Sequence, residues 1–151
     1  MTVPKKVFLI GQLWAGSTCE NRKRTLEELG CVIIGFDVGP YTQGDNGIFA
    51  SIAHRLNMGP PVAAMNRDLL TTIQRLPNDI DLIWVDKGKW LSPNVLHALK
   101  RATGALAVHY TPDAQLVDNR SSQFNAGIPL YDILFTTKPF EVDLYRKAGA
   151  K

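Results

Sequence analysis

Residues 7–18 of the chain read VFLIGQLWAGST. The run Val7–Ile10 is apolar without interruption, which is typical of a strand buried on both faces of a parallel sheet. A glycine-punctuated loop follows, and Ser17 with Glu20 matches the Ser-x-x-Glu capping box that begins many helices. This stretch therefore predicts a strand, a tight loop and a helix, the repeating unit of α/β folds.

The same alternation of apolar runs and helical patterns continues along the chain. The other predicted strands are at residues 31–37, 81–85, 105–110 and 132–137. The other predicted helices span residues 48–56, 62–76, 92–102 and 139–148, with loops at 38–47 and 111–129. Such alternation predicts parallel strands joined by right-handed crossovers, with helices on both faces. We expect one α/β domain over residues 1–151, a three-layer Rossmann-like fold with a parallel five-stranded sheet.

The composition agrees with a single globular domain. The 151 residues are 45% hydrophobic and 21% charged, which excludes a disordered, collagen-like or coiled-coil chain. The net charge of +3 is spread evenly, with 8 basic and 6 acidic residues in the first 75 positions and 9 and 8 in the rest. Because neither half is strongly basic, we expect no nucleic-acid partner.

The cysteine content and the apolar runs bear on the compartment. Cys19 and Cys31 are the two cysteines, too few for a disulfide framework or a zinc site, and we expect free thiols in a reducing compartment. The first apolar run is too short for a signal-peptide core, and no run approaches the roughly 18 apolar residues of a membrane span. The sequence therefore predicts a cytoplasmic protein without a membrane span.

In open α/β sheets, ligands bind beyond the carboxyl ends of the strands, so the first candidates follow the first strand. They are Gly11, Gly16, Ser17, Thr18 and Arg22. The loop lacks the lysine of a P-loop and the Gly-x-Gly-x-x-Gly pattern of dinucleotide-binding folds. The free N–H groups of a helix N-terminus still favour an anionic ligand. A tight strand-to-helix turn without a ligand explains the same residues about equally well.

Three residues after later strands suggest a different class of protein. Asp86, Thr111 and Lys138 follow the third, fourth and fifth predicted strands, where phosphoacceptor receiver domains place Asp, Ser or Thr, and Lys. Receiver chemistry also needs an acidic pair after the first strand to hold Mg²⁺, and this chain has Gly11 and Gln12 there. A degenerate receiver-like module, or a stand-alone ligand-binding or interaction module, remains the alternative interpretation.

Two further loops contain polar candidates. Lys87 and Gly88 fit a loop that lets its backbone approach a ligand, although a solvated turn is an equally good interpretation. Asp113 and Asn119 lie in the long loop after the fourth strand. Asp113 is a candidate for binding sugar hydroxyls or for proton transfer, and an Asx turn after Pro112 is its structural alternative. The three histidines lack metal-ligand spacing, so we expect no metal site.

Taken in order, these segments resemble spore-maturation CgeB-like proteins. The first is the loop at 11–18 with Arg22, which is similar to that family's strand, Gly-x-x-x-x-Gly-Ser-Thr and basic helix. The others are NRDLL at 66–70, DLIWVDKG at 81–88, YTPD at 110–113 and YDILFTTKP at 131–139. The resemblance spans nearly the whole chain and departs from the family at Pro112, where an acid is usual.

The resemblance implies a GT-B glycosyltransferase, in which two Rossmann-like domains move a sugar from a nucleotide-sugar donor to an acceptor hydroxyl. This chain resembles the N-terminal, mainly acceptor-side domain, and the resemblance implies a C-terminal domain, outside these 151 residues, that mainly holds the nucleotide sugar. We therefore expect this chain alone to be inactive. We also expect no cofactor beyond the nucleotide-sugar substrate, and possible self-association through an exposed apolar interdomain face.

The resemblance also implies roles for individual residues. It assigns the loop with Gly11, Gly16, Ser17, Thr18 and Arg22 to the donor-phosphate side, and it makes Asp113 the candidate catalytic residue. The candidates for the acceptor side are Asp86, Lys87, Gly88, Thr111, Asn119 and Lys138.

Overall fold

The computed structural model describes residues 5–42 and 57–151. Its centre is a five-stranded sheet in the order β2-β1-β3-β4-β5, in which every pairing is parallel. The strands are β1 (Lys6–Gly11), β2 (Val32–Asp37), β3 (Leu82–Asp86), β4 (Leu106–Thr111) and β5 (Ile133–Thr136). The predicted fold class and five-stranded parallel sheet are therefore confirmed.

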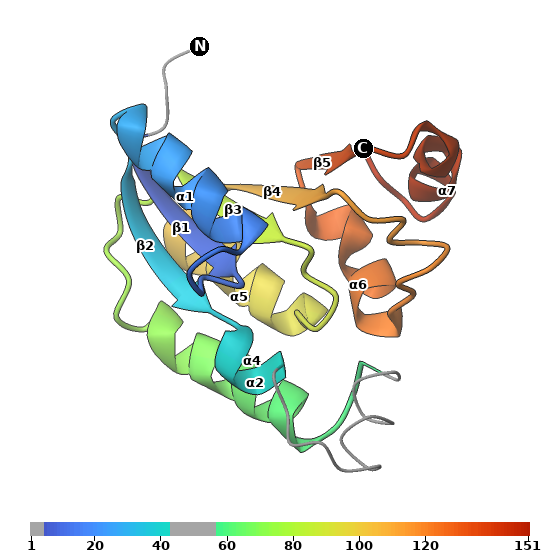
Figure 1. The fold of residues 1–151 in the computed structure, drawn as a ribbon. Coiled ribbons are helices and arrows are strands. Elements are labelled where there is room, and N and C mark those ends of the chain that lie inside the picture. The colour runs from blue at the N-terminus through green and yellow to red at the C-terminus, as the bar shows by residue number, and fades with distance from the viewer. Residues whose placement is uncertain (1–4, 43–56) are drawn as a thin grey trace.

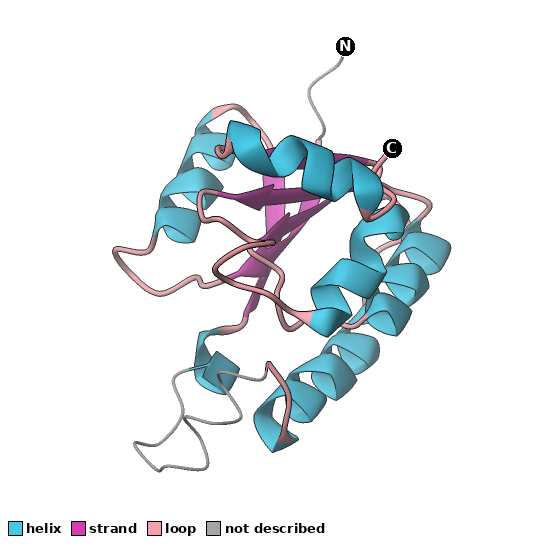
Figure 2. Cartoon of the chain, turned by 90° about the vertical axis from the view of Figure 1, so that its right-hand side faces the viewer, coloured by secondary structure: helices cyan, strands magenta, loops and turns pink. Residues whose placement is uncertain are grey.

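Helices lie on both sides of the strands (Figure 2). They are α1 (Thr18–Glu28), α2 (Gly39–Thr42), α4 (Pro60–Ile73), α5 (Pro93–Thr103), α6 (Ser122–Gly127) and α7 (Val142–Lys147), with short 3-10 turns η1 (Ile128–Leu130) and η2 (Pro139–Glu141). One face of the sheet lies against α1 (Figure 1). The opposite face, with Phe8 and Ile83, forms the main core with Met65 of α4 and Leu96 of α5.

Local sequence signals explain where these helices begin and end. Ser17 caps α1 through its Oγ, which accepts a hydrogen bond from the Glu20 N–H at 3.0 Å. Ser92 caps α5 in the same way through the Val95 N–H at 3.3 Å. Gly104 ends α5 with a φ of 66°, a left-handed conformation that glycine adopts without strain.

Several predicted boundaries need correction. The loop at 38–47 contains the short helix α2, and the loop at 111–129 contains α6 and η1. Ser121 caps α6, which turns Phe124 into the core, 4.5 Å from the His109 ring. The predicted helix at 62–76 begins earlier, at Pro60, because proline is tolerated in a first helical turn. The predicted helix at 48–56 lies outside the described residues, and the one at 139–148 divides into η2 and α7.

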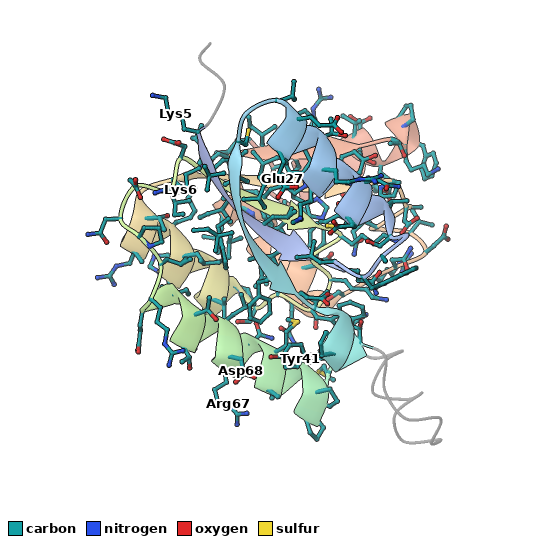
Figure 3. All side chains as sticks on the ribbon, turned by 60° about the vertical axis from the view of Figure 1, so that its left-hand side comes forward. Lys5, Lys6, Glu27, Tyr41, Arg67 and Asp68 are labelled. Carbon is teal, nitrogen blue, oxygen red and sulfur yellow. The ribbon has the colours of Figure 1, made fainter. Side chains whose placement is uncertain are left out.

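The short helix α2 is held by aromatic and polar contacts that the composition of its loop did not reveal. Tyr41 stacks on Phe36 with ring centroids 6.0 Å apart, and its hydroxyl donates to Asp68 Oδ2 at 2.8 Å. Tyr41 and Asp68 lie close together between α2 and α4 in Figure 3. Burial, with help from the Asp68 carboxylate, raises the pKa of Tyr41, so this hydroxyl remains a donor.

One part of the sheet on the α1 side carries exposed apolar side chains. Tyr110 faces α1, because the Arg22 guanidinium lies 4.5 Å from the centre of its ring. Phe135 is its register partner in β5 and therefore shares that face. Phe135, Ile133 and Leu106 are 48%, 44% and 56% exposed, far from the burial typical of sheet residues beneath a helix. The β4–β5 edge therefore presents an apolar surface.

No helix within residues 5–42 and 57–151 combines the length and apolar character needed to cross a membrane.

Candidate functional site

A cavity of about 350 Å³ lies at the carboxyl ends of β1, β3 and β4. In the observed strand order, the chain reverses direction across the sheet between β1 and β3, which is where doubly wound sheets bind their ligands. The predicted residues that line this cavity are Gly16, Ser17, Thr18, Asp86, Lys87, Gly88, Asp113 and Asn119. The structure thus brings together residues from loops that are far apart in the sequence.

The loop before α1 is a tight turn that also opens onto the cavity. The Ser17 Oγ donates to the Gln12 carbonyl at 2.5 Å while it caps the helix, and the Ser17 N–H donates to the Trp14 carbonyl at 3.0 Å. The Ser17 hydroxyl therefore both donates and accepts within the turn itself. The N-terminus of α1 still lines the cavity through Thr18 and Cys19, so the positive end of its dipole lies at the cavity.

Behind this turn, Arg22 and Asp86 form a nearly buried ion pair. Arg22 Nε donates to Asp86 Oδ2 at 2.7 Å, and Arg22 Nη2 lies 2.5 Å from the same oxygen. The Asp86 side chain is only 3% exposed, and burial raises the pKa of this carboxyl against the opposing effect of Arg22. Asp86 therefore lies at the base of the cavity with its carboxylate paired to the Arg22 guanidinium.

Cys19 lies against this ion pair and has the properties of an inert thiol. Burial, followed by the Asp86 carboxylate, raises the pKa of Cys19 to about 12. The thiol is packed so closely that a Cβ added to Gly11 would collide with Cys19 Sγ and would lie 2.9 Å from Asp86 Cβ. Gly11 does not line the cavity. Its missing side chain leaves the space in which Cys19 and Asp86 pack.

The loop after β3 has an unusual backbone that is held from both sides. Lys87 and Gly88 have φ angles of 62° and 56°, a left-handed conformation that is uncommon for lysine. The Lys87 N–H donates to the Tyr110 carbonyl at 2.8 Å, and His109 Nε2 donates to the Lys87 carbonyl at 3.0 Å. These bonds fix a strained residue at the cavity, a feature that is concentrated at functional sites.

His109 is neutral in this role. Its ring is fully buried between Phe124 and Tyr131, with centroids 4.5 and 5.4 Å away. Burial lowers the pKa of His109 to about 4, so Nε2 carries the proton that the Lys87 carbonyl accepts. His109 lies outside the cavity lining and acts on it through the Lys87 backbone.

The mouth of the cavity carries one ion pair and a further lysine. Lys87 Nζ lies 2.8 Å from Asp113 Oδ2, and each side chain is close to 40% exposed. Lys89 Nζ lies 4.5 Å from the centre of the Trp90 ring, and burial, followed by the charge of Lys87, lowers the pKa of Lys89. Because Asp113 offsets only one of the two lysines, this side of the cavity is net positive.

Three other predicted site residues do not reach the cavity. Arg22 lies behind it, on Asp86. Thr111 is fully buried, and its Oγ1 accepts a hydrogen bond from the Asp113 N–H at 3.2 Å. Lys138 lies beyond the edge strand β5, whereas the cavity is centred on β1 and β3. Thr111 therefore orients the loop that carries Asp113, and Lys138 has no lining role.

The sequence interpretation missed Gln115, which is 1% exposed and lines the cavity. It also missed Glu141, a fully buried carboxylate that binds the backbone of the same loop. Glu141 lies 26 positions from Gln115, and no local spacing connects them. A glutamate directly after Lys-Pro-Phe reads as a surface residue, so only the folded loop reveals its function.

The described residues contain no group of three or more His, Cys, Asp or Glu side chains that could hold a metal ion. Comparison with known proteins does not assign the site either. No protein-family model matches the chain, and no curated protein matches it.

Proposed function

We propose that this chain is the N-terminal, mainly acceptor-side domain of a glycosyltransferase that moves a sugar from a nucleotide-sugar donor to an acceptor hydroxyl. The observation that carries the proposal is the cavity at the β1/β3 reversal point, which combines a helix N-terminus, two lysines and several hydrogen-bonding side chains. The ordered sequence resemblance to CgeB-like proteins supports the same reading.

The two sides of the cavity suit the two parts of such a substrate. The N-terminus of α1 and Lys89 favour the negative charge of a diphosphate. Lys87, which the sequence resemblance assigns to the acceptor side, lines the same cavity, and we place it with them on the diphosphate side. Asp113 and Asn119 can hydrogen-bond sugar hydroxyls. Trp90 adds an aromatic surface to the lining. An anion bound by Lys87 would compete with Asp113 for the ammonium group and would release the carboxylate.

The released carboxylate suggests a mechanism. Asp113 would accept the proton of the acceptor hydroxyl while the hydroxyl oxygen of the acceptor forms a bond to the anomeric carbon of the sugar. The bond between that carbon and the phosphate oxygen would break, and the electron pair would leave with the nucleoside diphosphate. The α1 N-terminus and the two lysines would stabilise the charge that develops on this leaving group. A second domain would supply the remaining contacts to the nucleotide.

Binding of UDP-glucose, used as the probe, tests this proposal. We expect the 151-residue chain to bind it weakly without turnover, and Lys87→Met to reduce the affinity by about tenfold, the effect of losing one charged contact. Lys147→Met, on α7, is the matched control and should leave the affinity unchanged. Equal binding by the Lys87 and Lys147 variants, or enzyme-like turnover by the chain alone, would contradict the proposal.

A receiver-like module is the second candidate, because the strand order 2-1-3-4-5 is also that of receiver domains. The position of Asp86 favours the first proposal, since its carboxylate is buried on Arg22. Beryllofluoride with Mg²⁺ separates the two. A specific spectral response that Asp86→Asn abolishes would support the receiver reading.

The apolar surface formed by Leu106, Ile133 and Phe135 belongs to the same proposal. We propose it as the face through which the chain contacts its own second domain in an intact enzyme, and through which copies of this chain self-associate when that domain is absent.

A further inference from the structure

The loop between β4 and α6 forms one wall of the cavity and is held from behind by a buried carboxylate. Glu141, in η2, is 0% exposed. Its Oε2 accepts a hydrogen bond from the Gln115 N–H at 3.0 Å, and its Oε1 accepts from the Leu116 and Val117 N–H groups at 2.6 and 3.1 Å. Three successive N–H groups thus converge on one anion, as they do at the first turn of a helix.

Gln115 connects this buried contact to the cavity. Its backbone is bound to Glu141, while its side chain lines the cavity and is 1% exposed. Gln115 Nε2 donates to the Asn119 carbonyl at 3.0 Å, which fixes the orientation of the amide. The remaining acceptor, Oε1, has no hydrogen-bond partner among the described residues and is free to accept one from a ligand.

Other long-range contacts hold the two ends of the loop: Thr137 Oγ1 donates to the Pro112 carbonyl and Asn57 Nδ2 donates to the Arg120 carbonyl, both at 2.9 Å. The Asp118 and Asn119 N–H groups donate to the Ala114 carbonyl at 3.0 and 3.1 Å, which closes the turn on itself. At the centre of the loop, Glu141 is the long-range partner that joins the backbone of residues 115–117 to the segment after β5. Since Glu141 is not among the lining residues, any effect it has on a ligand passes through the loop.

We propose that Glu141 is a positioning residue for the cavity. Its carboxylate holds the amides of residues 115–117, and this contact places the Gln115 Oε1 where it selects ligands that carry a hydrogen-bond donor. The identity of the ligand rests on the proposed function, whereas the anchoring of the loop does not.

Two substitutions separate the contributions of the carboxylate oxygens. In Glu141→Gln, the remaining oxygen still accepts from Leu116 and Val117, but the new amide group meets the Gln115 N–H donor to donor. Glu141→Ala removes both acceptor oxygens and therefore all three hydrogen bonds. Asp143→Asn is the matched control. Asp143 is an exposed acid two positions away, and its side chain pairs with Arg146 on the same helix.

Amide hydrogen exchange, followed by NMR on the full chain, tests the anchoring. In Glu141→Gln we expect the protection of the Gln115 amide to fall by about tenfold or more, while Leu116 and Val117 keep most of theirs. In Glu141→Ala all three amides should lose protection, and in Asp143→Asn none should. Unchanged protection of Gln115 in Glu141→Gln would overturn the proposal, and this variant decides the matter if Glu141→Ala fails to fold.

A binding measurement tests whether Glu141 acts through Gln115. With UDP-glucose as the probe, Glu141→Gln and Gln115→Ala should each weaken binding by about tenfold, and the double variant should bind no more weakly than either single one. Additive losses would show that Glu141 does not act through Gln115 and would overturn that part of the proposal. If wild-type protein does not bind UDP-glucose, the proposed function fails, while the exchange experiment still decides the role of Glu141.

Discussion

The Arg22–Asp86 ion pair gives a prediction that follows directly from its geometry. Replacing Arg22 with methionine keeps the length of the aliphatic side chain and removes both donors to Asp86 Oδ2, at 2.5 and 2.7 Å. The Asp86 side chain is 3% exposed, so little water reaches the carboxylate to replace the guanidinium. Removing one partner of a buried pair costs about 3–5 kcal/mol of unfolding free energy, and since Arg22 is 23% exposed we expect the lower end, about 3 kcal/mol.

The pH dependence of this loss has a definite sign. Burial raises the pKa of Asp86 above its ordinary value of 3.8, and loss of Arg22 removes the main opposing effect. A group whose pKa is raised in the folded state favours folding at low pH, and this contribution is lost as the pH rises through the folded-state pKa. Arg22→Met should therefore be most destabilising near pH 8 and least destabilising near pH 4, where Asp86 can take up a proton.

Urea unfolding of a double-mutant cycle measures this effect. Arg22→Met, Asp86→Asn and the double variant would be compared with the wild type at pH 4 and pH 8 by circular dichroism. At pH 8 we expect the double variant to be more stable than additivity predicts by about 1.5 kcal/mol or more. Additive losses within about 0.5 kcal/mol, or a loss in Arg22→Met that does not change with pH, would show that the ion pair does not stabilise the fold in this way.

Other features of the site give further predictions. Gly88→Ala should lower the free energy of unfolding by about 2–4 kcal/mol, because residue 88 has a φ of 56° and the added Cβ would lie 2.7 Å from Val85 Cγ1. Gly104→Ala is the control: its φ is similar, but its added Cβ meets no atom within 4 Å, so the loss in the same urea assay should be about 1–2 kcal/mol. Cys19, with a pKa of about 12, should show roughly one thiolate in ten thousand at pH 8 and resist iodoacetamide in the folded state, as read by mass spectrometry; rapid alkylation would contradict its burial. The pKa of His109 is lowered to about 4 in the folded state, so the unfolded state takes up the proton first as the pH falls. The free energy of unfolding should therefore drop by up to about 3 kcal/mol between pH 6.5 and pH 4, and the His109 ring resonances should not titrate above pH 5. Phe135→Asp should reduce self-association in sedimentation velocity, and a strictly monomeric wild type at high concentration would argue against that surface.

The parts of the fold that the sequence predicts are those encoded by neighbouring residues. Apolar runs such as Val7–Ile10 mark buried strands, and the serine caps at Ser17 and Ser92 mark helix starts through bonds only three residues long. The helix α6 was missed because six residues provide too little periodicity to detect. Its position depends on Phe124 packing against His109, a contact between distant parts of the chain.

The site was predictable to the extent that it follows from topology. Since ligand sites lie at the carboxyl ends of parallel strands, Lys87 and Asp113 could be identified as candidates before their ion pair was seen. The same rule could not distinguish residues that line the cavity from residues that support it, such as Arg22 and Thr111. That distinction depends on side-chain direction and on contacts across 25 to 64 positions, as for Arg22 and Asp86.

The most direct test of the proposed binding site is a residue-by-residue map of where a nucleotide sugar contacts the chain. A titration of the ¹⁵N-labelled protein with UDP-glucose, followed by ¹H–¹⁵N correlation spectra, would provide it. We expect shifts confined to residues 16–19, 86–90 and 113–119, which surround the cavity. Absence of any shift at millimolar ligand, or shifts confined to α7 and the β5 edge, would contradict the claim that this cavity is the binding site.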